Sequence, residues 1–140
     1  MNNCIFCDIA NIDGKASIVY QDEICTAFMD IKPVNPGHVL IIPNKHATYL
    51  EDLNPDIGSH IFKVAQRLSK SVRKSNVKSE GIDLFLADGE AAGQEVYHLH
   101  LHIIPRYKGD GFRFRFGPNY GNLPERSVLD ELAQTIKRGL

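Results

Sequence analysis

Three histidines alternate with apolar residues along one segment of the chain, and this alternation constrains the fold more than any other feature. The segment runs from Val96 to Ile104 and reads VYHLHLHII. Successive side chains of a β-strand point to opposite faces, so His98, His100 and His102 share one face while the aliphatic side chains face a core. The sequence therefore predicts a strand over 96–104, ended by the proline that follows.

The remaining segments predict two helices and several short strands. Asn54 is suited to cap a helix that begins at Pro55, and apolar residues recur at helical spacing from Ile57 to Val72. The inward face of a second helix, expected from about residue 125, consists of Val128, Leu132 and Ile136. One or two helical turns are expected at 4–10, and strands at 18–20, 24–28, 39–42 and 82–86. Separate blocks of strands and helices predict an α+β fold with an antiparallel sheet.

The chain contains no repeat, linker or low-complexity segment, and its length of 140 residues predicts a single domain over 1–140. Residues 108–122 hold four glycines and one proline and predict a long loop. Within it, Arg113 to Phe116 alternates cations with aromatic rings, which favours an edge strand or a contact with a partner.

Charge and composition limit the possible partners. Sixteen Lys and Arg oppose 17 Asp and Glu, giving a net charge of −1, which argues against an extended nucleic-acid surface but not against a small nucleotide. Residues 1–10 lack the pattern of a secretory signal, and no apolar run approaches the roughly 20 residues of a membrane span. We therefore expect a cytoplasmic protein without membrane association, whose three cysteines are no disulfide framework.

The histidine face admits several explanations. Half-buried structural histidines would explain one imidazole but not three in strict alternation, and imidazoles on one strand can also converge on a metal ion. The third explanation is phosphoryl chemistry: a neutral imidazole is a good nucleophile near neutral pH, and a neighbouring imidazole can stabilise charge on phosphate oxygens.

The string HLHLHII resembles the signature of the histidine triad (HIT) family, and the likeness extends well beyond it. The segments that also match are Cys4–Cys7, Phe28–Ile31, Asn35–His46, Gly93–Tyr97 and Ile104–Tyr107. The resemblance covers about Cys4 to Gly111. It implies an antiparallel sheet of about five strands with one long central helix and a C-terminal helix, and it implies a homodimer.

The resemblance also assigns catalytic roles. His100 would attack the α-phosphate of a purine nucleotide or nucleotide conjugate, and His102 would contact the phosphate oxygens. The carbonyl of His98 would orient the ring of His100, while His38 would complete the hydrogen-bond network. Gln94 would lie near the phosphates or the leaving group.

For the substrate, the resemblance implies that the Asp30 carboxylate holds the ribose hydroxyls and that Glu95 lies near the phosphates or leaving group. Ile5, Phe6 and Ile31 would line the base pocket, although these three apolar residues fit a plain core equally well. One departure puts a nucleotide contact in doubt: several members carry Asn where this chain has Ala87 or Asp88. Since His102 stands where the hexose-phosphate transferase branch has Gln, hydrolysis is favoured over transfer.

A second site is implied at the N-terminus. Cys4 and Cys7 have the C-x2-C spacing of zinc ligands, and similar HIT proteins complete the set with two histidines, here His46 and His98. The alternatives are a redox pair or two unpaired thiols. We expect structural zinc and no organic cofactor.

Three functions follow from these observations. The chain is predicted to be an enzyme that hydrolyses a phosphoramidate or a dinucleoside polyphosphate through a covalent nucleotidyl-histidine. The alternatives are a nucleotide-binding scaffold with a vestigial site, and a module in which the triad itself holds a catalytic metal.

Overall fold

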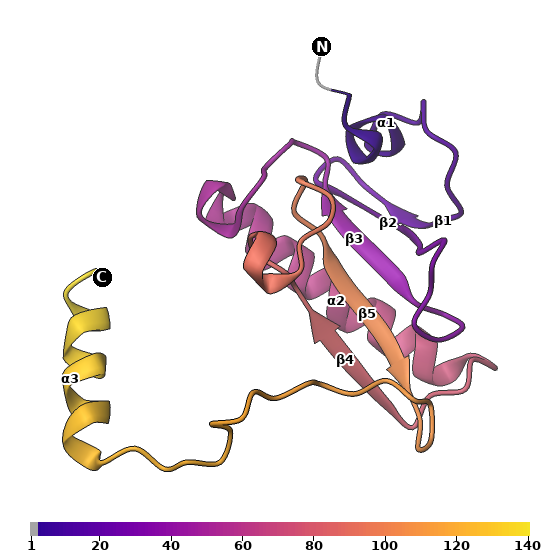
Figure 1. Cartoon of the computed structure of the whole chain (residues 1–140). Coiled ribbons are helices and arrows are strands. Elements are labelled where there is room, and N and C mark those ends of the chain that lie inside the picture. Colours follow the sequence, from indigo (N-terminus) through magenta and orange to yellow (C-terminus); the bar gives the residue numbers. More distant parts are fainter. Residues whose placement is uncertain (1–2) are drawn as a thin grey trace. The chain divides into compact units, whose positions relative to one another are not determined.

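The computed structural model describes residues 3–140, which form two compact units that divide after Asp110. The first unit carries every strand of the structure (Figure 1). Its elements in chain order are α1 (Ile5–Ala10), β1 (Ile18–Gln21), β2 (Cys25–Met29), β3 (Val39–Pro43), the short 3-10 helix η1 (Leu50–Asp52), α2 (Pro55–Lys74), β4 (Gly81–Phe85), the 3-10 helix η2 (Glu90–Ala92) and β5 (Leu101–Arg106). The predicted α+β fold with an antiparallel sheet of about five strands is confirmed.

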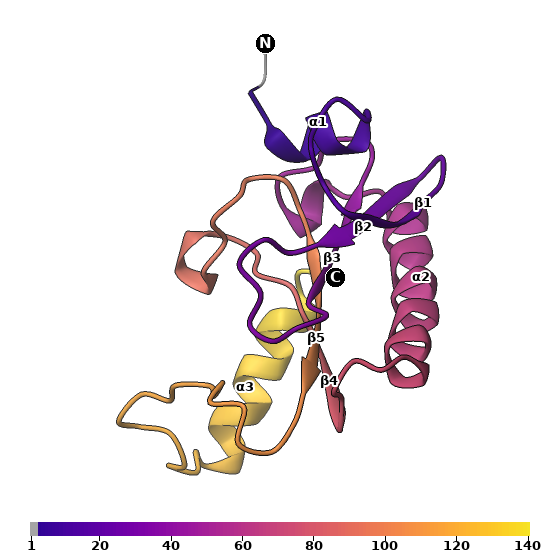
Figure 2. The ribbon, with the colours of Figure 1, turned by 90° about the vertical axis from the view of Figure 1, so that its right-hand side faces the viewer.

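The sheet has the strand order β1-β2-β3-β5-β4, and every neighbouring pair is antiparallel. Helix α2 covers one face, as the view along the sheet shows (Figure 2). The helix starts as predicted, because the Asn54 side chain accepts a hydrogen bond from the Asp56 amide at 2.8 Å and Pro55 occupies the first turn.

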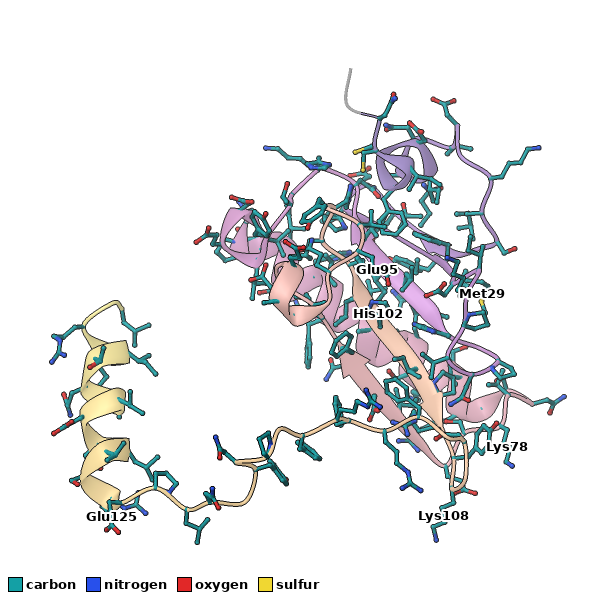
Figure 3. All side chains as sticks on the ribbon, viewed as in Figure 1. Met29, Lys78, Glu95, His102, Lys108 and Glu125 are labelled. Atoms are coloured by element: carbon teal, nitrogen blue, oxygen red, sulfur yellow. The ribbon has the colours of Figure 1, made fainter. Side chains whose placement is uncertain are left out.

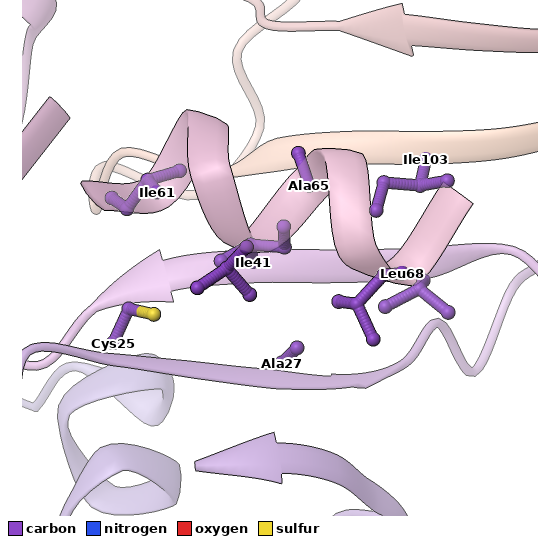
Figure 4. Close-up of a cluster of buried hydrophobic side chains, with 9 residues drawn as sticks. Cys25, Ala27, Ile41, Ile61, Ala65, Leu68 and Ile103 are labelled. Atoms are coloured by element: carbon purple, nitrogen blue, oxygen red, sulfur yellow. The ribbon is translucent and has the colours of Figure 1, made fainter. Parts of the chain in front are cut away.

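Alternation along β2 and β3 divides two cores between the faces of the sheet. On the α2 face, the buried residues of the cluster in Figure 4 are Cys25, Ala27, Val39, Ile41, Ile61, Val64, Ala65, Leu68 and Ile103. On the other face, α1 packs its buried side chains against Phe28, Leu40 and Ile42. His102 pairs with Leu40 in register and therefore belongs to the α1 face. Figure 3 labels His102 at β5, and its register with Leu40 places the histidine face on the side of the sheet away from α2.

The histidine strand differs from its prediction at both ends. Strand β5 begins at Leu101 rather than Val96, because the preceding backbone bonds elsewhere: the Leu99 amide donates to the Ala47 carbonyl at 2.7 Å. Pro105 lies inside β5, opposite Ile82 of β4. Its carbonyl accepts from the Asn35 side chain at 2.8 Å, so its ring nitrogen faces away from β4 and no ladder bond is lost.

The second unit, from Gly111 onward, contains the predicted C-terminal helix α3 (Arg126–Lys137). Within its own unit α3 buries no residue, and Val128, Leu132 and Ile136 are exposed there, so their inward orientation stays a prediction. Residues 113–116 are irregular rather than an edge strand, and the Phe116 ring stacks on Tyr120 at 3.8 Å between centroids. The alternative interpretation of this stretch, a contact with a partner, stays a prediction. The single domain predicted over 1–140 stays a prediction.

Candidate active site and metal centre

The central histidine is held by the backbone of the first. Nδ1 of His100 lies 2.8 Å from the carbonyl oxygen of His98. A carbonyl oxygen only accepts, so Nδ1 carries the proton and the lone pair of the neutral ring is on Nε2. The His100 side chain is 6% exposed, and the Phe6 ring stands edge-on to it at 5.2 Å. The structure thus presents one imidazole with a fixed tautomer and a free nucleophilic nitrogen.

The third histidine belongs to a chain of polar groups. The Val34 amide donates to Nδ1 of His38 at 3.0 Å, so the neutral ring of His38 carries its proton on Nε2. This Nε2 lies 2.9 Å from Nδ1 of His102 and 3.5 Å from the carboxylate of Asp30. Neutral His102 therefore accepts at Nδ1 and holds its own proton on Nε2, the nitrogen that remains free to meet a phosphate oxygen.

Burial keeps these rings neutral. It lowers the pKa of His38 despite the nearby Asp30 carboxylate, and it lowers the pKa of His98. The pKa of His102 falls to about 4 because of burial and then of the neighbouring His100 and His38. At neutral pH the chain from His38 to His102 thus consists of uncharged imidazoles joined by a hydrogen bond.

A second cluster joins the first histidine of the triad to the N-terminus. The ligand atoms of Cys4, Cys7, His46 and His98 all lie within 4.8 Å of one another. Nδ1 of His98 is 3.4 Å from the Cys4 sulfur and 3.5 Å from the Cys7 sulfur, and Nδ1 of His46 is 3.3 Å from the Cys7 sulfur. Four residues from three distant parts of the chain thus converge at one point.

The other predicted site residues are placed as follows. Gln94 is buried, and its side chain accepts from the Gly89 amide and donates to the Thr48 and Val96 carbonyls, so it ties the loop before the triad together. Phe6 is buried in the α1 core. The exposed side chains among the predicted substrate residues are Ile5, Ile31 and Glu95. Ile5 and Glu95 line an open depression beside Cys4 and His46.

Comparison with known proteins identifies this arrangement. The model of the HIT domain family matches residues 12–109, which is more than half of the chain. This chain belongs to the HIT family. An uncharacterized HIT-like protein of Borreliella burgdorferi is 40% identical over 141 residues and matches along the full length of both chains. The adenylylsulfatase HINT3 of Arabidopsis thaliana is 34% identical over 78% of this chain and 55% of its own.

Solved structures of HIT proteins agree with the fold. A HIT family protein of Bacillus anthracis superimposes with a TM-score of 0.91 at 38% identity, covering 99% of this chain and 98% of its own. A zinc-bound histidine triad protein of Mycobacterium smegmatis gives a TM-score of 0.76 at 36% identity, covering 95% and 97%. Membership of the HIT family is thereby shown by sequence and by structure.

The four-residue cluster of this HIT protein fits a tetrahedral zinc ion. Zinc bound by Cys at about 2.3 Å and His at about 2.0 Å separates adjacent ligand atoms by about 3.6 Å, close to the three distances above. Nε2 of His98 donates to the Pro43 carbonyl at 2.8 Å, which leaves Nδ1 free to bind a metal. Burial and the adjacent Cys4 side chain raise the pKa of the Cys7 thiol to about 11, so paired thiolates here require a bound cation.

Several groups that build the HIT site were missed by sequence reasoning. The Pro43 and Ala47 carbonyls hold the first histidine and its neighbour, and backbone atoms carry no sequence signal. The Val34 amide, which fixes the tautomer of His38, is a third such backbone group. Among the described residues no helix is long and apolar enough to span a membrane.

Proposed function

We propose that this HIT protein is a nucleotidyl hydrolase or transferase that acts on the α-phosphate of a nucleotide conjugate through a covalent intermediate on His100. The observation that carries the proposal is the 2.8 Å bond from Nδ1 of His100 to the His98 carbonyl. It fixes the tautomer in which Nε2 is the nucleophile, at the position where the family signature places its central histidine. The adenylylsulfatase name of the Arabidopsis relative supports the same reaction class.

The proposed reaction has two displacements on phosphorus. Nε2 of His100 forms a bond to the α-phosphorus while the bond to the leaving group breaks, its electron pair going to the leaving atom, which takes up one proton. The substituted ring of His100 is then a cation, and its Nδ1 proton remains bonded to the His98 carbonyl, which stabilises that charge. Water next attacks phosphorus, loses a proton and frees Nε2, releasing a nucleoside monophosphate.

The surrounding residues would serve this reaction in separate ways. The Nε2 proton of His102, directed by the bond to His38, would donate to a phosphate oxygen as charge develops there. Asp30 would accept from the ribose hydroxyls through Oδ2, the carboxylate oxygen that does not accept from the Lys32 amide. Ile31 and Ile5, both exposed, would cover the purine base.

Zinc belongs to the proposal as a structural ion held by Cys4, Cys7, His46 and His98. The zinc-bound mycobacterial relative supports it. When bound, the ion would supply a cation that keeps both thiols ionised and would join α1 to the sheet. Elemental analysis of protein purified without chelator should find one zinc per chain, and metal-free protein would contradict this part.

A homodimer completes the proposal. Strand β4 is an edge of the sheet, and apolar side chains on it and on α2 are exposed: Leu84 is 41% exposed, Phe85 37% and Phe62 53%. An unpaired edge beside exposed apolar residues is suited to pair with a second copy. Sedimentation should give a mass of two chains, and Phe62→Glu should shift it toward one.

The test of the activity uses an adenosine phosphoramidate. Wild-type protein should release AMP, and early quenching should show a mass gain of one nucleotidyl group located on His100. His100→Ala should bind the nucleotide without turnover or adduct. Nucleotide binding without turnover by the wild type would instead support a scaffold, and Ala87, which is buried and has no polar side chain, would be the first residue to restore to Asn.

A further inference from the structure

The nucleophile lies outside the regular sheet. Strand β5 begins at Leu101, so residues 96–100 have no ladder bonds to either neighbouring strand. His100 is therefore not positioned by the sheet in the way His102 is. Its orientation depends on individual contacts, and the question is which residues supply them.

Three contacts that fix this segment lead back to the cysteine–histidine cluster. The carbonyl that holds Nδ1 of His100 belongs to His98, itself a member of the cluster. The Leu99 amide is held by the carbonyl of Ala47, the residue directly after His46. If the cluster came apart, the contacts made by the His98 carbonyl and by the Ala47 carbonyl would both loosen. A third contact, made by an aromatic ring, would loosen with them.

The aromatic link is Phe6, which stands between the two cysteines in the sequence. Its ring lies edge-on to His98 at 5.9 Å and to His100 at 5.2 Å. Helix α1, which carries Phe6, is only six residues long, too short to be stable without tertiary contacts. Ligation of Cys4 and Cys7 would therefore also fix the wall against which the nucleophile packs.

We infer that Cys4, Cys7 and His46 are positioning residues for His100: a zinc ion bound by them and His98 would fix the rotation of the nucleophilic ring. The inference rests on the proposed function and on zinc binding, and it gives the metal a role in turnover without contact to the substrate. A ring free to rotate would present Nε2 in line with phosphorus only part of the time, which lowers the rate of the chemical step.

The inference predicts a loss in kcat with little change in KM. Asp30 and Ile31, proposed contacts to the ribose and the base, follow β2 and lie outside the cluster, so most of the nucleotide affinity should survive loss of the metal, and only the proposed contact from Ile5 on α1 should weaken. The sheet should survive as well, because the α2 core contains no cluster residue. Loss of the metal should therefore be felt locally, at α1 and residues 96–100.

The experiment uses His46→Ala in the full chain, because this substitution removes one ligand and leaves the cysteines, Phe6 and the His98 carbonyl in place. Cys25→Ala is the matched control, since Cys25 is a buried thiol outside the cluster. We would measure the zinc content and the kcat and KM with adenosine phosphoramidate. We would also record the imidazole N–H signals in a ¹⁵N-histidine spectrum. The spectrum of His100→Ala assigns the Nδ1 proton of His100.

In the wild type, the His100 Nδ1 proton should be protected from exchange by its bond to His98. In His46→Ala zinc should be lost, this signal should broaden or vanish, and kcat should fall about 10- to 100-fold, while KM should rise at most a few-fold through the weakened contact of Ile5. Cys25→Ala should keep the zinc, the signal and kcat. If His46→Ala does not fold, wild-type protein stripped by chelator and reloaded with zinc gives the same comparison.

Loss of zinc with an unchanged Nδ1 signal would overturn the inference, as would wild-type protein that binds no zinc. A protein that turns over no nucleotide conjugate would refute the proposed function, but the proton signal would still decide whether the cluster orients His100. The two failures are therefore distinguishable.

Discussion

The two outer histidines of the triad, His98 and His102, have the same side chain and lie on the same face of one segment, yet their surroundings suit them to different tasks. His98 donates from Nε2 to the Pro43 carbonyl and turns Nδ1 toward two sulfurs. His102 turns its Nδ1 toward the Nε2 proton of His38, with a carboxylate behind it. One end offers a lone pair to a cation, and the other is suited to pass hydrogen bonds to an anion.

The difference teaches that the partner of one ring nitrogen decides what the other nitrogen can do. In both rings a backbone or histidine partner selects the tautomer, and the free atom then points either to the thiols or to the substrate side. His100 lies between the two ends: its Nδ1 bonds the His98 carbonyl, and its ring centroid lies 4.9 Å from that of His102. Substitutions that damage one end but not the other should separate metal binding from catalysis.

The largest expected effect comes from the residue between the two ends. His100→Ala should lower kcat/KM at least about 1,000-fold, because it removes the nucleophile. Zinc content should not change, since His100 is not a member of the cluster. The control is His60→Ala, which removes a histidine of α2 that bonds Asp22; this variant should retain activity. Activity equal in both variants would exclude His100 as the nucleophile.

At the metal end, Cys7→Ser should weaken zinc binding more than about 100-fold. Removing a group that hydrogen-bonds to a metal-ligating side chain lowers metal affinity about 10- to 100-fold, and removing the ligating side chain itself should lower it further. Competition with a chromophoric chelator measures the affinity, and His102→Gln, changed at the opposite end, should bind zinc as the wild type does. Equal zinc affinity in Cys7→Ser and wild type would remove Cys7 from the site.

At the other end, two substitutions of His38 test its two nitrogens separately. In His38→Asn the side-chain carbonyl can still accept from the Val34 amide, but the side-chain amide is too short to donate to His102. The longer amide of His38→Gln can donate to His102. We expect kcat/KM to fall about 10- to 100-fold in the Asn variant, as for loss of a buried hydrogen bond of about 1–3 kcal/mol, and less in the Gln variant. The opposite order would mean that the bond to Val34 matters more.

Acid should destabilise the His102 end. The pKa of His102 is about 4 in the fold and near 6.5 in an unfolded chain. Between these values the unfolded chain binds the proton more readily, so the free energy of unfolding should fall as the pH drops from about 6.5 to 4. Urea midpoints at pH 7 and pH 4.5 measure this change, and it should be smaller in His102→Gln. An equal pH dependence in both proteins would assign it to other groups.

The smallest effect is expected at the edge of the substrate site. Ile31 is 88% exposed, so Ile31→Ser should not disturb the fold but should raise KM a few-fold, by about 1 kcal/mol, if the side chain covers the base. Leu123→Ser, at an apolar residue 93% exposed in the second unit, is the control and should leave KM unchanged. Equal KM in both variants would remove Ile31 from the substrate site.

Sequence reasoning reached the fold because alternation and capping are local signals. The continuous run of β-branched and aliphatic residues in β3 and the Asn54 cap of α2 each act within a few residues, and both elements lie where they were expected. The histidine strand was predicted to begin five residues too early, because the carbonyl of His98 and the amide of Leu99 bond outside the ladder. Such bonds depend on tertiary approach, which no local pattern reports.

The C-terminal helix shows the limit from the other side. Its apolar spacing correctly predicted a helix, but periodicity cannot say whether a covering surface exists, and Leu132 is 55% exposed. The tautomers of His38 and His98 were equally beyond prediction, since each is set by a backbone group, the Val34 amide and the Pro43 carbonyl, and backbone groups carry no sequence signal.

The separation of the metal ligands along the chain has a consequence for biosynthesis. Cys4 and His98, the first and last of the proposed zinc ligands, are 94 residues apart, so 94 further residues must be translated after Cys4 before the set of ligands is complete. A cross-link across so long a loop removes much conformational entropy from the unfolded chain. The proposed nucleophile, His100, is translated two residues after that ligand, so a nascent chain that binds zinc would capture the ion and complete its active site at almost the same moment.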